Sequence, residues 1–168
     1  YHAEAQRDGK LGDYHEAARW YRKYLGYFPG EPDSANTNFL LAETLFESKE
    51  FDAAMIEFDR TAYDYQVHKR SAEAAFASIL AYREHEVSLH GSNQAQWHSR
   101  YLDSGLKFAD SYPEHPESGA VLTTIAEDLF AQGQFDRAIS VGQLVVSKLS
   151  ADARRVGQEL RLGWSPSR

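Results

Sequence analysis

Two stretches of this chain match each other: LAETLFESKEFDAAM, residues 41–55, and IAEDLFAQGQFDRAI, residues 125–139. Seven of the fifteen positions are identical, and isoleucine replaces Leu41 and Met55 in the second stretch. In each one, apolar residues spaced by three or four give way to a polar turn, and a phenylalanine opens a second apolar run. The pattern predicts two helices joined by a tight turn, repeated along the chain.

A third, partial copy precedes them in GDYHEAARWYRKYLGYFP, residues 12–29. Glycine accepts the backbone conformation of a turn between two helices without steric strain. The aromatic residue that follows packs at the start of the second helix, and a small alanine lets the two helices approach closely. These three residues recur at one spacing: Gly12, Tyr14 and Ala17 in the first copy, and Gly133, Phe135 and Ala138 in the last.

These positions resemble the tetratricopeptide repeat (TPR) family. The resemblance implies an all-α fold in which antiparallel helical hairpins stack as a right-handed solenoid. Two residues depart from the family pattern: Lys49 replaces the turn glycine, and Gly142 replaces an aromatic residue of the second helix. The small residue of the first helix is Ala42 or Ala126, and the aromatic after the turn is Tyr14, Phe51 or Phe135. The alanine that follows is Ala17, Ala54 or Ala138. Tyr21 and Phe58 match the second aromatic, and Pro29 matches the closing proline.

The copies are unevenly spaced. Tyr14 and Phe51 lie 37 residues apart, near the TPR period of about 34 residues, whereas Phe51 and Phe135 lie 84 residues apart. We therefore expect one overlong, degenerate repeat over residues 69–113, with Ala77 at the small position and a turn lengthened to HEVSLHGSNQAQ.

Periodicity and turn residues together predict nine helices and one repeat domain. Prolines block helix continuation in PGEP and YPEHPE, and Asp33, Ser34, Glu117 and Ser118 stand where capping groups are wanted. The domain is expected to hold about four hairpins plus a terminal helix over residues 1–162, followed by a flexible tail at 163–168. The expected helices are residues 2–9, 13–27, 34–47, 51–64, 69–88, 95–111, 117–131, 135–148 and 151–161.

Composition narrows the classes of partner. The chain of 168 residues has no cysteine, which excludes disulfides and thiol chemistry, and it carries a formal net charge of -7. An acidic surface repels phosphate backbones, so no nucleic-acid partner is expected. Its apolar runs are far shorter than a membrane span, so we expect no direct membrane insertion of these residues.

Two turns suggest a cellular setting. YRKYLGYFPGEP, residues 21–32, and YLDSGLKFADSYPEHPE, residues 101–117, look like the turns of bacterial envelope TPR proteins. In that group, which includes the outer-membrane assembly lipoproteins and the TolA-binding coordinators, an aromatic–proline pair followed by a second proline closes many repeats. The resemblance implies a periplasmic or outer-membrane-associated scaffold, with the cytoplasm as the alternative.

Residues suited to catalysis do not form a recognisable motif. His85, Glu86, His90 and His98 cluster in the sequence, but five residues separate the first two histidines, whereas metal ligands on one helix face are three or four apart. Neither a phosphate-binding glycine loop nor a serine-nucleophile motif is present. We expect no catalytic residue, no cofactor and no metal, and a protein that is not an enzyme.

In TPR proteins the first helix of each hairpin lines a concave groove, and the resemblance carries this role onto three helices. The groove would bind a protein or peptide that presents apolar anchors with basic or amide groups. Packing of Phe46 and Phe130 against the next helix is the alternative that the sequence leaves open. The candidate groove residues are Asn36, Phe39, Glu43 and Phe46; Ser71, Ala74, Ser78 and Tyr82; and Thr123, Glu127 and Phe130.

The sequence thus favours a protein–protein interaction scaffold. Self-association as a homo-oligomer is the first alternative, and a metal-dependent enzyme built on the histidine cluster is the second. Aromatic residues crowd 20–28; we expect Tyr21, Tyr24 and Phe28 to face the core and Trp20 and Tyr27 to lie partly off that stripe.

Overall fold

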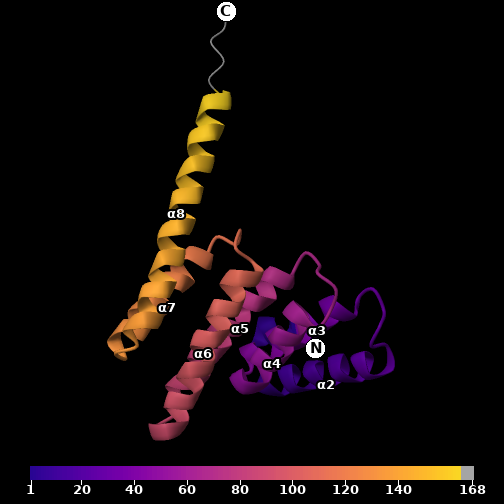
Figure 1. Ribbon diagram of the computed structural model, residues 1–168. Helices are drawn as coiled ribbons and strands as arrows, with labels where there is room; N and C mark the ends of the chain where they lie inside the picture. Colours follow the sequence, from indigo (N-terminus) through magenta and orange to yellow (C-terminus); the bar gives the residue numbers. More distant parts are fainter. Residues whose placement is uncertain (164–168) are drawn as a thin grey trace, which may run out of the picture. The chain divides into compact units, whose positions relative to one another are not determined.

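The computed structural model describes the backbone of residues 1–163 and the side chains of residues 1–151, 153 and 154. Within that part of the chain the fold is all-α, with eight helices and no strand, so the prediction of an all-α protein is confirmed (Figure 1). The helices are α1 (His2–Asp8), α2 (Leu11–Tyr27), α3 (Ser34–Glu47), α4 (Phe51–Tyr63), α5 (Ser71–Val87), α6 (Gly91–Ser111), α7 (Ser118–Ala131) and α8 (Phe135–Gly163).

The helices group into two compact units. The first unit is Tyr1–Ser104 and the second begins at Gly105, within α6. The single repeat domain expected over residues 1–162 stays a prediction.

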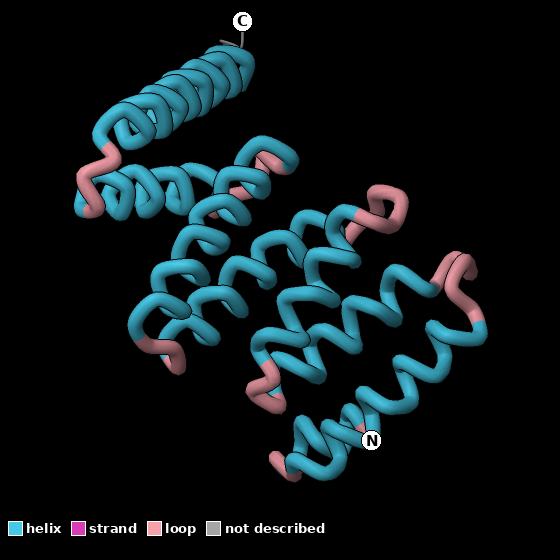
Figure 2. The backbone as a smooth tube through the Cα atoms, turned by 60° about the horizontal axis from the view of Figure 1, so that its bottom comes forward, coloured by secondary structure: helices cyan, strands magenta, loops and turns pink. Residues whose placement is uncertain are grey.

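In the first unit, the helices α1 to α5 pack in sequence order: α1 on α2, α2 on α3, α3 on α4, and α4 on α5. Figure 2 shows these helices side by side, joined by short loops. Large apolar side chains of the middle helices form the core because their three- and four-residue spacing places them on one face. The fully or nearly fully buried ones are Phe39, Leu41, Leu45, Phe58 and Ile79.

In the second unit, α7 packs against α8, and these helices bury Leu122, Ile125, Leu129 and Val141. Gly105 of α6 lies close against α7: a Cβ placed on it would lie 2.6 Å from Cδ1 of Ile125. A glycine here lets the two helices approach closely.

The two matching stretches have the same local structure. In the first, the amide of Lys49 donates to the carbonyl of Phe46. In the second, the amide of Gly133 donates to the carbonyl of Phe130. The next amide in each turn also donates back to an equivalent carbonyl, Glu50 to Leu45 and Gln134 to Leu129. The helical hairpin predicted for residues 41–55 and 125–139 is therefore confirmed.

Two predicted interruptions are wrong. The helices expected at 135–148 and 151–161 form the single helix α8, because Leu149 and Ser150 include neither glycine nor proline to stop it. The lengthened turn HEVSLHGSNQAQ is mostly helical: α5 runs to Val87 and α6 starts at Gly91, whose left-handed φ of 62° follows a loop of residues 88–90.

Smaller corrections concern the ends of helices. Gly12, the predicted turn glycine of the first copy, lies inside α2. The turn glycine is Gly9, whose left-handed φ of 65° ends α1 three residues earlier. Neither Asp33 nor Glu117 makes a side-chain cap hydrogen bond. Gly163 of the expected tail is the last residue of α8, and residues 164–168 lie outside the described residues.

The aromatic residues of α2 are less buried than expected. Tyr21 and Tyr24 are half-buried, and Trp20 and Tyr27 are exposed, as their spacing predicts. The prediction for Phe28 is wrong: it is 48 % exposed, because the helix ends at Tyr27 and the chain turns before its side chain reaches the core. No helix of residues 1–163 combines the length and apolar character needed to cross a bilayer.

Candidate functional site

A cleft of about 310 Å³ opens in the first unit between α3, α4 and α5. We call it the acidic cleft. Three of the predicted groove residues of α3, Phe39, Glu43 and Phe46, line it, while Asn36 lies half-buried one turn earlier on the same helix. The full lining is Phe39, Glu43, Phe46, Glu47, Phe58, Glu73, Phe76, Ala77 and Leu80.

Aromatic rings in edge-to-face contact form the apolar part of the acidic cleft. The ring of Phe58 meets that of Phe39 edge-on, with centroids 5.5 Å apart, and that of Phe46 at 6.4 Å. Phe46 also meets Phe51, the aromatic residue after the turn, at 5.2 Å. Phe39 and Phe58 are buried and Phe46 is half-buried, so Phe46 presents an accessible ring supported by its neighbours.

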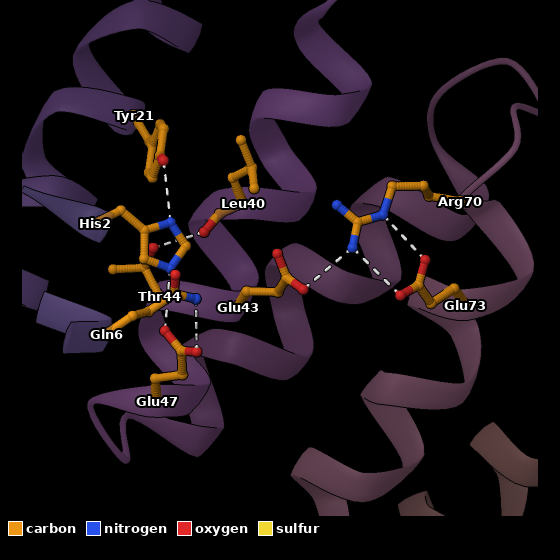
Figure 3. Close-up of polar contacts among 9 residues, drawn as sticks. All are labelled: His2, Gln6, Tyr21, Leu40, Glu43, Thr44, Glu47, Arg70 and Glu73. Carbon is orange, nitrogen blue, oxygen red and sulfur yellow. Dashed lines mark hydrogen bonds and ion pairs between the residues drawn. The ribbon is translucent and has the colours of Figure 1, made fainter. Parts of the chain in front are cut away.

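Three carboxylates, those of Glu43, Glu47 and Glu73, accompany this apolar surface. Figure 3 shows Arg70 between two of them: its guanidinium donates to Glu43 at 3.1 Å and to Glu73 at 3.0 Å. The same guanidinium lies 3.3 Å from the ring centroid of Phe39. Arg70 immediately precedes α5, so the turn before this helix supplies a cation to the cleft. The cation fixes the carboxylates of Glu43 and Glu73, which form part of the rim, and it covers the ring of Phe39, which with Phe58 forms the floor.

Burial and neighbouring groups shift the pKa values of both members of this ion pair. Desolvation raises the pKa of Glu43 above its ordinary value, and this effect outweighs the opposing charge and hydrogen bond of Arg70. For Arg70, burial lowers the pKa, but the hydrogen bond to Glu73 and the charge of Glu43 outweigh it and raise the pKa overall. The guanidinium therefore stays charged, and Glu43 is the carboxyl whose charged form the site disfavours.

The first helix supports the other end of the rim. One ring nitrogen of His2 lies 3.0 Å from a carboxylate oxygen of Glu47, and the amide of Gln6 donates to the other oxygen at 3.0 Å (Figure 3). The second ring nitrogen of His2 lies 3.1 Å from the hydroxyl of Tyr21 on α2. These contacts hold the carboxylate of Glu47 in one orientation beside the acidic cleft.

The predicted groove residues of α5 lie elsewhere. Ser71, Ala74 and Ser78 are completely buried, and Tyr82 is half-buried with its ring 5.7 Å from that of Trp97. Three of the α5 residues that line the cleft instead lie two positions after Ser71, Ala74 and Ser78, and a fourth is Ala77. The four residues are Glu73, Phe76, Ala77 and Leu80.

Sequence reasoning also missed Glu47, Phe58 and Arg70. Glu47 is exposed and follows Glu43 by one helical turn, which was a usable signal. Arg70 stands in an irregular loop, and only the folded chain shows that the loop brings it to α3.

In the second unit, Glu127 and Phe130 line a shallow hollow of about 370 Å³ with Ala126, Ala138 and Ile139. Thr123 is exposed, and its hydroxyl donates to the carbonyl of Gly119 within the helix. The residues equivalent to Phe39 and Phe58 are Thr123 and Gly142, so this hollow lacks the two rings that floor the acidic cleft.

The histidine cluster forms local contacts. Nδ1 of His98 lies 2.9 Å from the carboxylate of Glu86, and the ring of His85 meets that of Trp97 at 4.6 Å. Among the described residues, no group of three or more histidine, cysteine or acidic side chains is placed to hold a metal ion.

The chain matches no protein-family model and no curated protein sequence, so the geometry and chemistry of the acidic cleft carry the functional proposal.

Proposed function

We propose that this protein is an interaction module that binds a segment of another protein in the acidic cleft. One observation carries the proposal: a partly accessible aromatic surface lies beside three carboxylates that helix packing and side-chain hydrogen bonds hold in place. Fixed groups of this kind favour binding because they lose little conformational entropy when a partner arrives.

The shape and charge of the cleft specify the partner. Its volume of about 310 Å³ is at the low end of ligand pockets, roughly 300–1,000 Å³, which suits about one or two large apolar side chains. Lysine or arginine near that anchor would meet Glu47 and Glu73, whose carboxylates outnumber the single guanidinium of Arg70. We therefore propose a peptide segment with an aromatic or aliphatic anchor flanked by a basic residue.

The finer fold assignment is part of the same proposal. The equivalent turns after α3 and α7, and the buried alanines Ala17, Ala54 and Ala138 at one repeat position, support a TPR-type right-handed solenoid. In such an arrangement α1, α3 and α5 would present successive walls of one groove. The aromatic–proline turns before α3 and α7 support a place among scaffolds of the bacterial envelope.

Selection from a random peptide library displayed on phage tests the proposal without requiring that the natural partner be identified first. The expected result is enrichment of peptides that combine a large apolar residue with a nearby lysine or arginine. These peptides should bind the Glu47→Lys variant at least tenfold more weakly. The substitution replaces a carboxylate of the rim with a positive charge, which repels the basic residue of the peptide.

Asp52→Lys is the matched control, since Asp52 is an exposed carboxylate of α4 outside the cleft lining and its reversal changes the net charge equally. Enrichment of acidic peptides, or equal loss of binding in both variants, would refute a specific role for the acidic cleft.

A further inference from the structure

A second apolar surface lies on the hairpin of α7 and α8. It comprises Ala126, Glu127, Phe130, Ala138 and Ile139, and we call it the α7/α8 face. Phe130 is 65 % exposed and Ile139 is 60 % exposed. These two large apolar side chains line the same hollow, and adjoining exposed apolar side chains favour a surface to which another element binds.

The first unit shows what covers the equivalent surface. At the same repeat positions, 84 residues earlier, stand Ala42, Glu43, Phe46, Ala54 and Met55. There α5 packs against α4, and the counterpart of Ile139, Met55, is only 6 % exposed. Ala42 and Ala54 are completely buried.

Small residues allow α5 to sit so close. Ala74, Ala75 and Ser78 are at most 1 % exposed, and the hydroxyl of Ser78 points to the carbonyl of Met55 at 3.5 Å. Just before α5, Arg70 forms its ion pair with Glu43. The cover is therefore a helix with a face of small residues, preceded by a cation that meets the glutamate.

We propose that the α7/α8 face binds a helix of a partner protein that reproduces these features of α5. Its small residues would pack over Ala138 and Ile139, and an arginine or lysine before the helix would pair with Glu127, the counterpart of Glu43. The helix α5 of a second copy is not free to fill this role, because it is buried against α4 of its own chain.

The chain contains its own probe, a synthetic peptide of residues 66–88 that spans Arg70 and α5. Fluorescence anisotropy of the labelled peptide with the whole protein should show saturable binding. Ile139→Glu should weaken it at least tenfold, because a buried charge without a partner opposes packing. Ile56→Glu is the matched control: Ile56 is 53 % exposed on α4 and belongs to neither surface, so the affinity should change less than twofold.

A charge exchange tests the orientation of the helix. Arg70→Glu in the peptide should reduce its affinity about fivefold or more, and Glu127→Arg in the protein should restore most of that loss. Restoration would support the proposed pairing; equal weakening by both changes would overturn it.

Two further results would overturn the proposal. The first is binding that is absent, not saturable or unchanged by Ile139→Glu. The second is a dimer in sedimentation equilibrium that Ile139→Glu dissociates, because a second copy would then cover the face. Ile139 lies outside the acidic cleft, so its substitution separates binding at the α7/α8 face from binding in that cleft, and the proposed function stands or falls separately.

Discussion

Lys49 and Gly133 occupy equivalent positions in two helical turns, and both have a left-handed backbone, with φ of 67° and 73°. The turn thus requires this conformation even where the chain carries a side chain with a Cβ. For a non-glycine residue the left-handed region costs roughly 1–2 kcal/mol. The hydrogen bonds and packing of the hairpin overcome that strain at Lys49.

The strain at Lys49 predicts a stabilising substitution. Lys49→Gly should raise the free energy of unfolding by about 0.5–1 kcal/mol, because relief of the left-handed strain exceeds the added entropy of the unfolded glycine. Gly133→Ala should lower it by about 1 kcal/mol, through the backbone alone, since a Cβ there would meet no atom within 4 Å. Urea denaturation of both variants provides the measurement. Destabilisation by Lys49→Gly would show that contacts of the Lys49 side chain stabilise the fold by more free energy than its left-handed backbone costs.

Two buried serines at the starts of helices predict opposite outcomes. The hydroxyl of Ser34 donates to the carbonyl of Phe28 at 2.5 Å, whereas the hydroxyl of Ser118 has no hydrogen-bond partner among the described residues. Ser34→Ala should therefore lower the free energy of unfolding by about 1 kcal/mol. Ser118→Ala should leave it unchanged or raise it, because a buried polar atom is removed. Thermal unfolding of the pair checks this difference, and equal losses would contradict it.

Arg70 has two roles that one substitution separates. Arg70→Gln removes the cation over Phe39 and its bonds to two carboxylates, so stability should fall by about 1–2 kcal/mol. Affinity for a basic peptide in the acidic cleft should rise about fivefold, because a nearby positive charge no longer opposes it. Calorimetric titration with a peptide from the library selection measures the second effect. Weaker binding would instead mean that Arg70 itself contacts the ligand.

The raised pKa of Glu43 predicts a dependence of stability on pH. The folded state holds the proton of this carboxyl more tightly than the unfolded state does. The contribution of Glu43 to stability is therefore greatest at or below its ordinary pKa of 4.5 and is lost as the pH rises through the raised folded pKa. Relative to Glu43→Gln, the unmodified protein should lose stability across that interval. Urea midpoints of both proteins from below pH 4.5 to neutral pH measure the difference, and a difference that grows in the opposite direction would refute the assignment.

Local patterns predict most of the fold because the decisive interactions are local. The repeat of Phe46 and Phe51 by Phe130 and Phe135 predicts two equivalent hairpins, and both pairs of rings meet edge-on, at 5.2 and 5.3 Å. The sequence-based break near residue 150 is wrong because no residue there forces a helix to end. Polar residues at 91–96 are typical of a turn, but they are equally compatible with an exposed stretch of helix, and α6 contains them while burying Leu102 and Phe108 further along.

The candidate site depends on contacts that spacing cannot reveal. Phe39, Glu43 and Phe46 are predictable because one helix places them on one wall. The opposite wall is formed by Glu73 and Phe76 and not by the expected Ser71 and Ser78, because the sequence does not fix how a degenerate helix is rotated about its axis. The role of Arg70 arises from the path of a loop, which no local pattern specifies.

The central claim is that the acidic cleft binds a partner segment through its apolar wall. The most direct measurement is the affinity of a library-selected peptide for Phe76→Ala and for Ile56→Ala, with circular dichroism confirming that both variants fold. Phe76 lines the cleft, and Ile56 is an exposed apolar residue outside it. The account predicts at least a tenfold loss of affinity for Phe76→Ala and no change for Ile56→Ala. Unchanged affinity for Phe76→Ala would contradict it.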